Sequence, residues 1–130
     1  MGRSSPRVLI VEDDFIVGHD LREMVRSLGL DTIGPIPGVA PALAIVQEVP
    51  VDAALLDVRI DDGLSFPVAD ALDAAGIPYA FVTGLNNFVD REPRFAEKPV
   101  VGKPMRLADI VDALRECGMP VRPPESNGAT

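Results

Sequence analysis

The sequence predicts one doubly wound α/β domain built on a five-stranded parallel sheet, and three observations carry this prediction. Short apolar runs of strand length alternate along the chain with stretches whose apolar residues recur at helical spacing. The runs lack strict alternation of apolar and polar residues, as is typical of parallel strands buried on both faces. The chain has 130 residues, 47% of them hydrophobic and 25% charged, which suits a single cored domain.

Five segments supply the predicted strands. The strongest candidates are the continuous apolar runs at residues 8–11, 51–56 and 78–82. Two weaker runs, residues 31–36 and 100–101, fill the remaining positions. Because strands and helices alternate, right-handed crossovers should place helices on both faces of the sheet.

Helices are predicted between and after these strands. The apolar stripes run from Val17 to Leu28, from Val39 to Val46 before Pro50, from Leu64 through Val68 and Leu72 to Gly76, and from Leu107 to Leu114 before Gly118. Gly118 suits the left-handed conformation that closes a helix. The fourth helix, expected within residues 85–99, should be short or irregular because Pro93 and Pro99 oppose regular helix.

The predicted domain spans residues 7–118. Residues 1–6 are expected to form a flexible N-terminus, and the proline-rich, polar residues 119–130 a disordered tail. The apolar run before Glu12, residues 8–11, has only four residues, too few for a signal peptide or a membrane span, so a cytoplasmic protein is expected. Because this tail is short, no DNA-binding or enzymatic output domain is expected.

Charge and cysteine content exclude several classes of protein. Twelve Lys and Arg residues against twenty Asp and Glu give a formal charge of −8, which disfavours nonspecific binding to nucleic acid or anionic lipid. Cys117 is the single cysteine and His19 the single histidine. The sequence therefore contains neither an internal disulfide nor a zinc cluster.

Polar residues follow the predicted strands, where ligands bind in doubly wound sheets. They are Glu12, Asp13 and Asp14 after the first strand, Asp57 after the third, Thr83 after the fourth and Lys103 after the fifth. Carboxylates that converge repel one another unless a hard cation lies between them, so Mg²⁺ is expected. A lysine ammonium and a threonine hydroxyl suit the oxygens of a phosphate held beside the metal.

With these residues the chain resembles the receiver domain of bacterial two-component response regulators. The matching strings are VLIVEDD (8–14), ALLDVRIDDG (54–63), FVTG (81–84) and VGKP (101–104), in the family's order. FVTG is also similar to the Phe-Ala-Thr-Gly motif of a subgroup of stand-alone receivers. The resemblance implies the flavodoxin-like receiver fold, a histidine kinase or histidine phosphotransfer protein as phosphodonor, and signalling through contact with a downstream protein.

The resemblance also assigns roles to individual residues. Asp57 would be the phosphoacceptor, Asp13 a direct Mg²⁺ ligand and Glu12 an acidic partner of the metal acting through water. Thr83 would move toward the phosphoryl group and Lys103 would be its counter-ion. The backbone carbonyl of Arg59 would complete the metal shell, and the Lys103–Pro104 peptide is expected to be cis. No enzymatic activity is expected beyond Mg²⁺-dependent self-phosphorylation and dephosphorylation.

The chain departs from the receiver pattern at Val100, where receivers commonly carry an aromatic residue that rotates on phosphorylation. We therefore predict that residues 85–99 carry the signal instead, with changed exposure of Phe88 and Phe95. The departure also leaves open a phosphorylation-independent binding module with the same fold. A third alternative, a metal-dependent phosphatase, needs a second carboxylate two residues after the nucleophile, where this sequence has Arg59.

Four other features have simpler interpretations. Asp14 is expected to cap the first helix, and His19 to lie on its exposed face. Cys117 should be a partly buried small side chain. The alternating charges of residues 90–106 are typical of a solvated surface.

Overall fold

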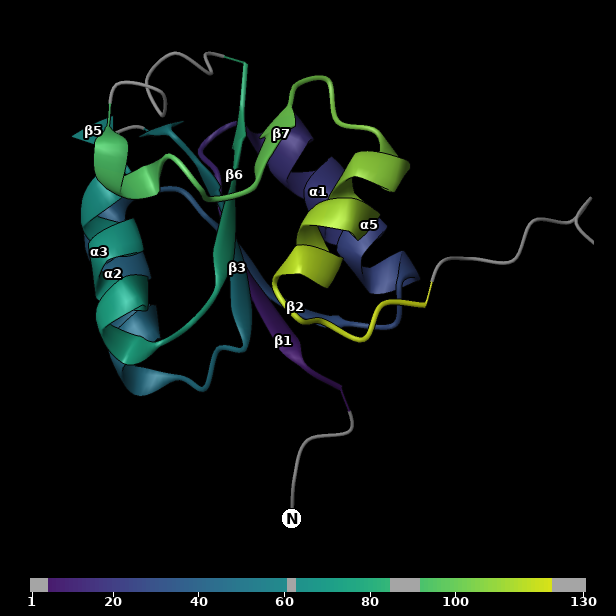
Figure 1. Ribbon diagram of the computed structural model, residues 1–130, viewed down its shortest axis with the longest axis horizontal. Helices are drawn as coiled ribbons and strands as arrows, with labels where there is room; N and C mark the ends of the chain where they lie inside the picture. Colours follow the sequence, from purple (N-terminus) through teal and green to yellow (C-terminus); the bar gives the residue numbers. More distant parts are fainter. Residues whose placement is uncertain (1–4, 61–62, 85–91, 123–130) are drawn as a thin grey trace, which may run out of the picture.

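The structure has the parallel sheet that the sequence predicts. A computed structural model describes residues 5–60, 63–84 and 92–122 (Figure 1). Its main sheet has five parallel strands in the order β2-β1-β3-β6-β7. These strands are β1 (Arg7–Val11), β2 (Asp31–Ile36), β3 (Ala53–Asp57), β6 (Tyr79–Thr83) and β7 (Val100–Gly102).

Helices cover both faces of the sheet, which confirms the doubly wound arrangement. Helices α1 (Phe15–Ser27) and α5 (Leu107–Glu116) lie on one side, and α2 (Val39–Glu48) and α3 (Phe66–Ala75) on the other (Figure 1). Alternate residues of β1 enter the two cores, since Val8 and Ile10 pack beneath α1 and α5 while Leu9 and Val11 face α2 and α3. Burial on both faces explains why this strand is continuously apolar.

Two short strands follow β3 and were not predicted. Strand β4 (Arg59–Ile60) pairs antiparallel with β5 (Gly63–Leu64). Leu64, which the sequence places at the start of the third helix, therefore lies in a strand, opposite Arg59. The Ser65 N–H donates to the Val58 carbonyl at 2.8 Å, so this pairing holds the chain out of the helix until Phe66.

The fourth helical position is irregular where the structure describes it. A 3-10 helix, η1 (Pro93–Phe95), precedes β7. Residues 85–91, where the rest of that element was predicted, lie outside the described residues.

The disordered tail predicted for residues 119–130 does not include residues 119–122, which are held against the domain. Met119 and Val121 pack against the core cluster beneath α1 and α5, and the Arg122 N–H donates to the Leu28 carbonyl at 2.8 Å. Two apolar side chains separated by one residue supply enough buried contact to hold residues 119–122 against the domain. The rest of the proposed tail and residues 1–4 lie outside the described residues.

Among the residues that the structure describes, no helix is both long and apolar enough to cross a membrane.

Candidate functional site

The polar residues singled out in the sequence meet at the carboxyl edge of the sheet. Glu12 and Asp13 directly follow β1, Asp57 ends β3 and Thr83 ends β6. Parallel strands in register bring these ends together: Val11 pairs with Leu56 and Thr83 pairs with Gly102, which precedes Lys103. A cleft of about 360 Å³ opens here, lined by Glu12, Asp13, Asp14, Asp57, Arg59, Thr83, Gly84 and Lys103.

Three carboxylates in this cleft form a group that suits a divalent cation. Glu12, Asp13 and Asp57 each offer one oxygen, and these oxygens lie within 4.8 Å of one another. Glu12 is 2% exposed and Asp57 7% exposed, whereas Asp13 is half-buried. Hard oxygen ligands around a partly open position are the donor set that Mg²⁺ prefers, so the residues present fit the ion.

Lys103 supplies the positive charge of the site. Its Nζ lies 2.9 Å from Asp57 Oδ2 and 2.8 Å from Glu12 Oε1. The Lys103 N–H donates to the Thr83 carbonyl at 3.2 Å, which ties the lysine to the end of β6. The Lys103–Pro104 peptide is cis, as predicted.

The charges around Glu12 shift its proton affinity strongly. The pKa of Glu12 is raised to about 7: burial is the largest cause and the neighbouring Asp57 adds to it, while Lys103 and the Asp14 N–H oppose the shift. For Lys103 burial lowers the pKa, but Glu12 and Asp57 outweigh burial and the net pKa is raised. Without a metal the three carboxylates face a single lysine, and the raised pKa means that Glu12 takes up a proton more readily than an ordinary glutamate does.

Asp14 lines the cleft but its side chain serves the first helix. Its Oδ1 accepts hydrogen bonds from the N–H groups of Ile16 and Val17, at 2.9 and 3.1 Å. The predicted cap is confirmed. The Asp14 N–H also donates to Glu12 Oε2 at 3.1 Å, a contact that orients the glutamate and that sequence analysis did not anticipate.

Thr83 and Arg59 occupy the walls of the same cleft. Thr83 is buried at the end of β6, and Arg59 is an exposed residue two positions after Asp57. His19 is exposed on α1 and Cys117 is buried at the end of α5, in agreement with the simpler interpretations of both. Burial raises the pKa of the Cys117 thiol to about 11.

A cluster of four aromatic rings lies behind the cleft and was missed in the sequence. Phe81, in β6, contacts Phe66, Tyr79 and Phe95, with ring centroids 6.0, 5.6 and 5.4 Å away. Phe95 is fully buried and Phe88 lies outside the described residues, so the change in their exposure stays a prediction. Val100 pairs with Phe81 and is 42% exposed.

Three of the charged residues between 92 and 98 lie at the surface, as expected, and also form ion pairs. The Arg94 guanidinium lies 4.6 Å from the ring centroid of Phe95 and forms ion pairs with Asp70 and Glu92. Lys98 lies over the ring of Tyr79 and pairs with Asp73. The acids Asp70 and Asp73, which pair with Arg94 and Lys98, lie on α3, far away in the sequence. The local alternation of charges could not reveal these pairs.

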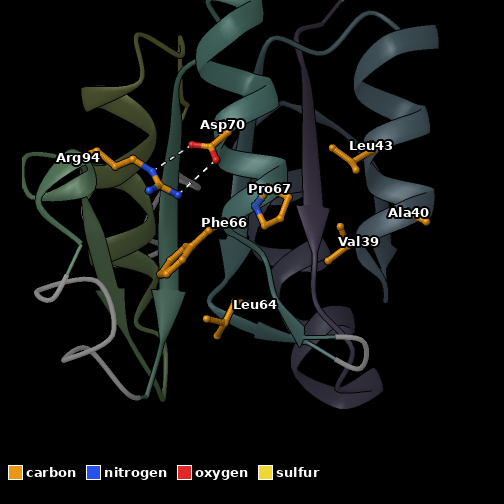
Figure 2. A pocket seen from close by; sticks show the side chains of 8 residues that line it. All are labelled: Val39, Ala40, Leu43, Leu64, Phe66, Pro67, Asp70 and Arg94. Atoms are coloured by element: carbon orange, nitrogen blue, oxygen red, sulfur yellow. Dashed lines mark hydrogen bonds and ion pairs between the residues drawn. The ribbon is translucent and has the colours of Figure 1, made fainter.

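A larger cleft of about 630 Å³ lies between α2 and α3, away from the carboxylates (Figure 2). Val39, Leu43, Leu64 and Phe66 make its lining mostly apolar, and the Arg94–Asp70 pair lies at one side. Among the described residues that line it, the two charged ones, Asp70 and Arg94, are paired with each other.

Comparisons with solved structures give close matches to the fold. The chain is similar to SdrG from Sphingomonas melonis Fr1, with 35% identity and a TM-score of 0.79 over 91% of this chain and 100% of that one. It is also similar to the signal receiver domain of a modulated diguanylate cyclase from Desulfovibrio desulfuricans G20, with 25% identity and a TM-score of 0.77 over 88% of this chain and 94% of that one.

A third structure shares the fold and holds a metal. The receiver domain of the sensor histidine kinase PA1611 from Pseudomonas aeruginosa PAO1 is 21% identical, with a TM-score of 0.77 over 88% of this chain and 98% of that one. Its structure has a magnesium ion coordinated in the active-site cleft.

Among curated proteins the chain is similar to the transcriptional regulatory protein PdtaR of Mycobacterium tuberculosis. The two are 26% identical over 117 residues, covering 83% of this chain and 54% of that protein. The chain thus spans about half the length of the curated relatives that it matches. No family model matches it.

Proposed function

Because the chain belongs to the receiver domains of two-component response regulators, we propose that it accepts a phosphoryl group on Asp57. The observation that carries the proposal is the contact of Lys103 Nζ with both Asp57 and Glu12 beside Asp13. A buried carboxylate that adjoins a lysine and two further acids can serve as a nucleophile toward phosphorus. Such a site works by positioning and by neutralising charge.

In the proposed reaction an Asp57 carboxylate oxygen forms a bond to phosphorus while the bond from phosphorus to the donor breaks. The donor atom keeps that electron pair: a histidine nitrogen takes a proton from water, whereas acetyl phosphate releases acetate, which needs none. Lys103 then pairs with the new phosphoryl group, and the Thr83 hydroxyl donates a hydrogen bond to one of its oxygens. Glu12, Asp13, Asp57 and the carbonyl of Arg59 would hold Mg²⁺, which supplies charge neutralisation for the phosphoryl oxygens.

We further propose a histidine kinase or a histidine phosphotransfer protein as the donor. Two large apolar side chains stand exposed at the start of α1, Phe15 at 81% and Ile16 at 72%. They directly follow Asp14, which lines the Asp57 cleft. Exposed apolar groups of this size at a site rim are typical of a protein contact, and a protein donor must dock here to bring its phosphohistidine to Asp57.

A phosphorylation-independent binding module is the second candidate. The observation in its favour is Val100, which cannot act as a rotating aromatic reporter. Electrophoresis on a phosphate-binding gel after incubation with acetyl phosphate and Mg²⁺ separates the two. A shifted band that is absent in Asp57→Asn and retained in the surface variant Asp112→Asn supports phosphorylation, whereas no shift in any protein supports the module.

The docking part of the proposal has its own test. Phe15→Ala should slow phosphotransfer from a purified kinase of the source cell, while labelling by acetyl phosphate stays unchanged because the small donor needs no protein contact. Equal transfer rates for the variant and the wild type would contradict the role of Phe15. Steady turnover of a generic phosphomonoester would instead favour a phosphatase.

A further inference from the structure

A second cleft, of about 470 Å³, lies along β2 at the opposite end of the sheet from Asp57. It is lined by residues 31–34 of β2 and by three arginines, Arg7 of β1 and Arg22 and Arg26 of α1. Asp31 is the single acid among its lining residues. The cleft is thus basic in a chain whose formal charge is −8.

The arginines are largely uncommitted to partners within the domain. Across the part of the chain that the structure describes, no carboxylate forms an ion pair with Arg7 or Arg26. Arg22 has two local contacts on α1, an ion pair with Glu23 at 3.6 Å and a contact of its Nη2 with His19 Nδ1 at 3.3 Å, but its buried Nε has no hydrogen-bond partner. A guanidinium carries five N–H donors, so unsatisfied donors line this cleft.

The cleft also contains an open strand edge. Strand β2 ends the order of the sheet, so within residues 5–60, 63–84 and 92–122 only one of its sides pairs with a neighbouring strand. The Asp31 N–H donates to the Pro6 carbonyl at 2.9 Å, on the side of β1. Because successive peptide groups of a strand point to opposite sides, the N–H groups of Thr32 and Gly34 point to the open edge.

From these two features we propose that this cleft binds an acidic, extended segment of a partner protein, which pairs with the edge of β2. Main-chain hydrogen bonds to Thr32 and Gly34 supply the register, and carboxylates of the segment pair with Arg22 and Arg26. An open edge selects a polypeptide over a small anion, and the arginines select an acidic one. Asp31 lies at the start of β2, so the segment binds without covering Asp57.

The test uses a short synthetic peptide of alternating glutamate and threonine, titrated into ¹⁵N-labelled protein. We expect saturable shifts of the Thr32 and Gly34 amide signals and an affinity that falls as salt rises. A peptide with lysine in place of glutamate should not bind. A glutamate–threonine peptide with alternate N-methylated residues should bind about tenfold more weakly, since it cannot pair with the edge.

Variants of the protein complete the test. The double substitution Arg22→Gln and Arg26→Gln should weaken binding about tenfold, because two charge-assisted hydrogen bonds are lost. Arg115→Gln is the matched control, an exposed arginine in the last turn of α5 as Arg26 is in the last turn of α1. Asp57→Asn should leave peptide binding unchanged, so the outcome is separate from the phosphoryl chemistry.

Three results would overturn the proposal. One is the absence of shifts at Thr32 and Gly34. Another is equal binding of the N-methylated peptide or full competition by inorganic phosphate, which would indicate a simple anion site. The third is self-association of the arginine double variant when the wild type binds no peptide, which would show that the arginines only protect the edge from aggregation.

Discussion

Glu12 is a buried acid whose neighbours are the carboxylate of Asp57 and the ammonium of Lys103. Its pKa of about 7, against an ordinary value of 4.5, has a direct consequence for stability. Between these two values the folded chain holds a proton that the unfolded chain has released. The free energy of unfolding must therefore fall as the pH rises from 4.5 to about 7.

We expect this slope in urea unfolding of the metal-free protein, and we expect Glu12→Gln to lack it because the amide does not titrate. Adding Mg²⁺ should remove the loss, since the cation favours the ionised acid. If the wild type and Glu12→Gln show the same pH dependence in the absence of metal, another group carries the titration.

Gly34 is a second residue whose surroundings should decide how a substitution affects stability. It has φ +99°, and a Cβ added there would lie 2.6 Å from the Ile10 carbonyl oxygen. An alanine would meet both a strained backbone and the backbone of the neighbouring strand. Neither the backbone at Gly34 nor that at Ile10 can shift without breaking the pairing of β1 with β2.

Three glycine-to-alanine variants separate these effects in chemical denaturation. Gly102→Ala meets nothing within 4 Å and no positive φ, so its unfolding free energy should change by less than about 0.5 kcal/mol. Gly63→Ala, at φ +127° in open space, should lose about 1–2 kcal/mol through strain alone. Gly34→Ala should lose roughly 2–5 kcal/mol, and a loss no larger than that of Gly63→Ala would show that β2 gives way.

At the scale of elements, the ring of Phe95 anchors η1 in the core. Phe95 lies against Phe66 at 5.0 Å and against Phe81 at 5.4 Å, and Arg94 covers its outer side. Phe81 lies two residues before Thr83 on β6. We therefore expect a movement of Thr83 toward a phosphoryl group to change the packing of Phe95 as well.

Phe95→Ala should lower the free energy of unfolding by about 3–5 kcal/mol, because it leaves a cavity in the aromatic cluster. Phe15→Ala is the matched control, since the same substitution at an exposed site should cost less than about 0.5 kcal/mol. Urea unfolding of both variants provides the measurement. Similar small losses in the two would mean that η1 contributes little to the core.

At the scale of the whole molecule, the carboxylates of the site are placed by the meeting of two strand ends. Glu12 and Asp13 follow β1, and Asp57 ends the adjacent β3. The fold therefore brings several acids together at one edge of the sheet. Among the residues described, Lys103 is the cation within ion-pair distance of Glu12 and Asp57. Folding without a cation must work against this repulsion.

We predict that metal-free Asp57→Asn melts at a higher temperature than metal-free wild type, by a few degrees for about 1 kcal/mol. Asp112→Asn removes the same charge from an exposed position on α5 and should leave the melting temperature nearly unchanged. Mg²⁺ should raise the melting temperature of the wild type more than that of Asp57→Asn. Equal metal-free melting temperatures for the wild type and both variants would contradict repulsion at the site.

The sequence by itself determined the sheet, the helices on both faces and the residues at its carboxyl edge. Buried parallel strands are continuously apolar, and polar residues at their ends are therefore conspicuous, as Asp57 and Lys103 are. The helix cap at Asp14 could also be predicted from the local sequence, because its side chain accepts hydrogen bonds from N–H groups only two and three residues later. The subgroup suggested by FVTG and the individual catalytic roles stay predictions.

Only the tertiary structure decided which residues distant in sequence meet. Phe66, Phe81 and Phe95 come from three elements, and Arg94 and Lys98 find their acids on α3. The same holds for the basic cleft, where arginines of β1 and α1 converge on an edge strand. Local pattern reports whether a residue is buried or exposed, but side-chain partners depend on the strand order and helix placement that bring separate segments together.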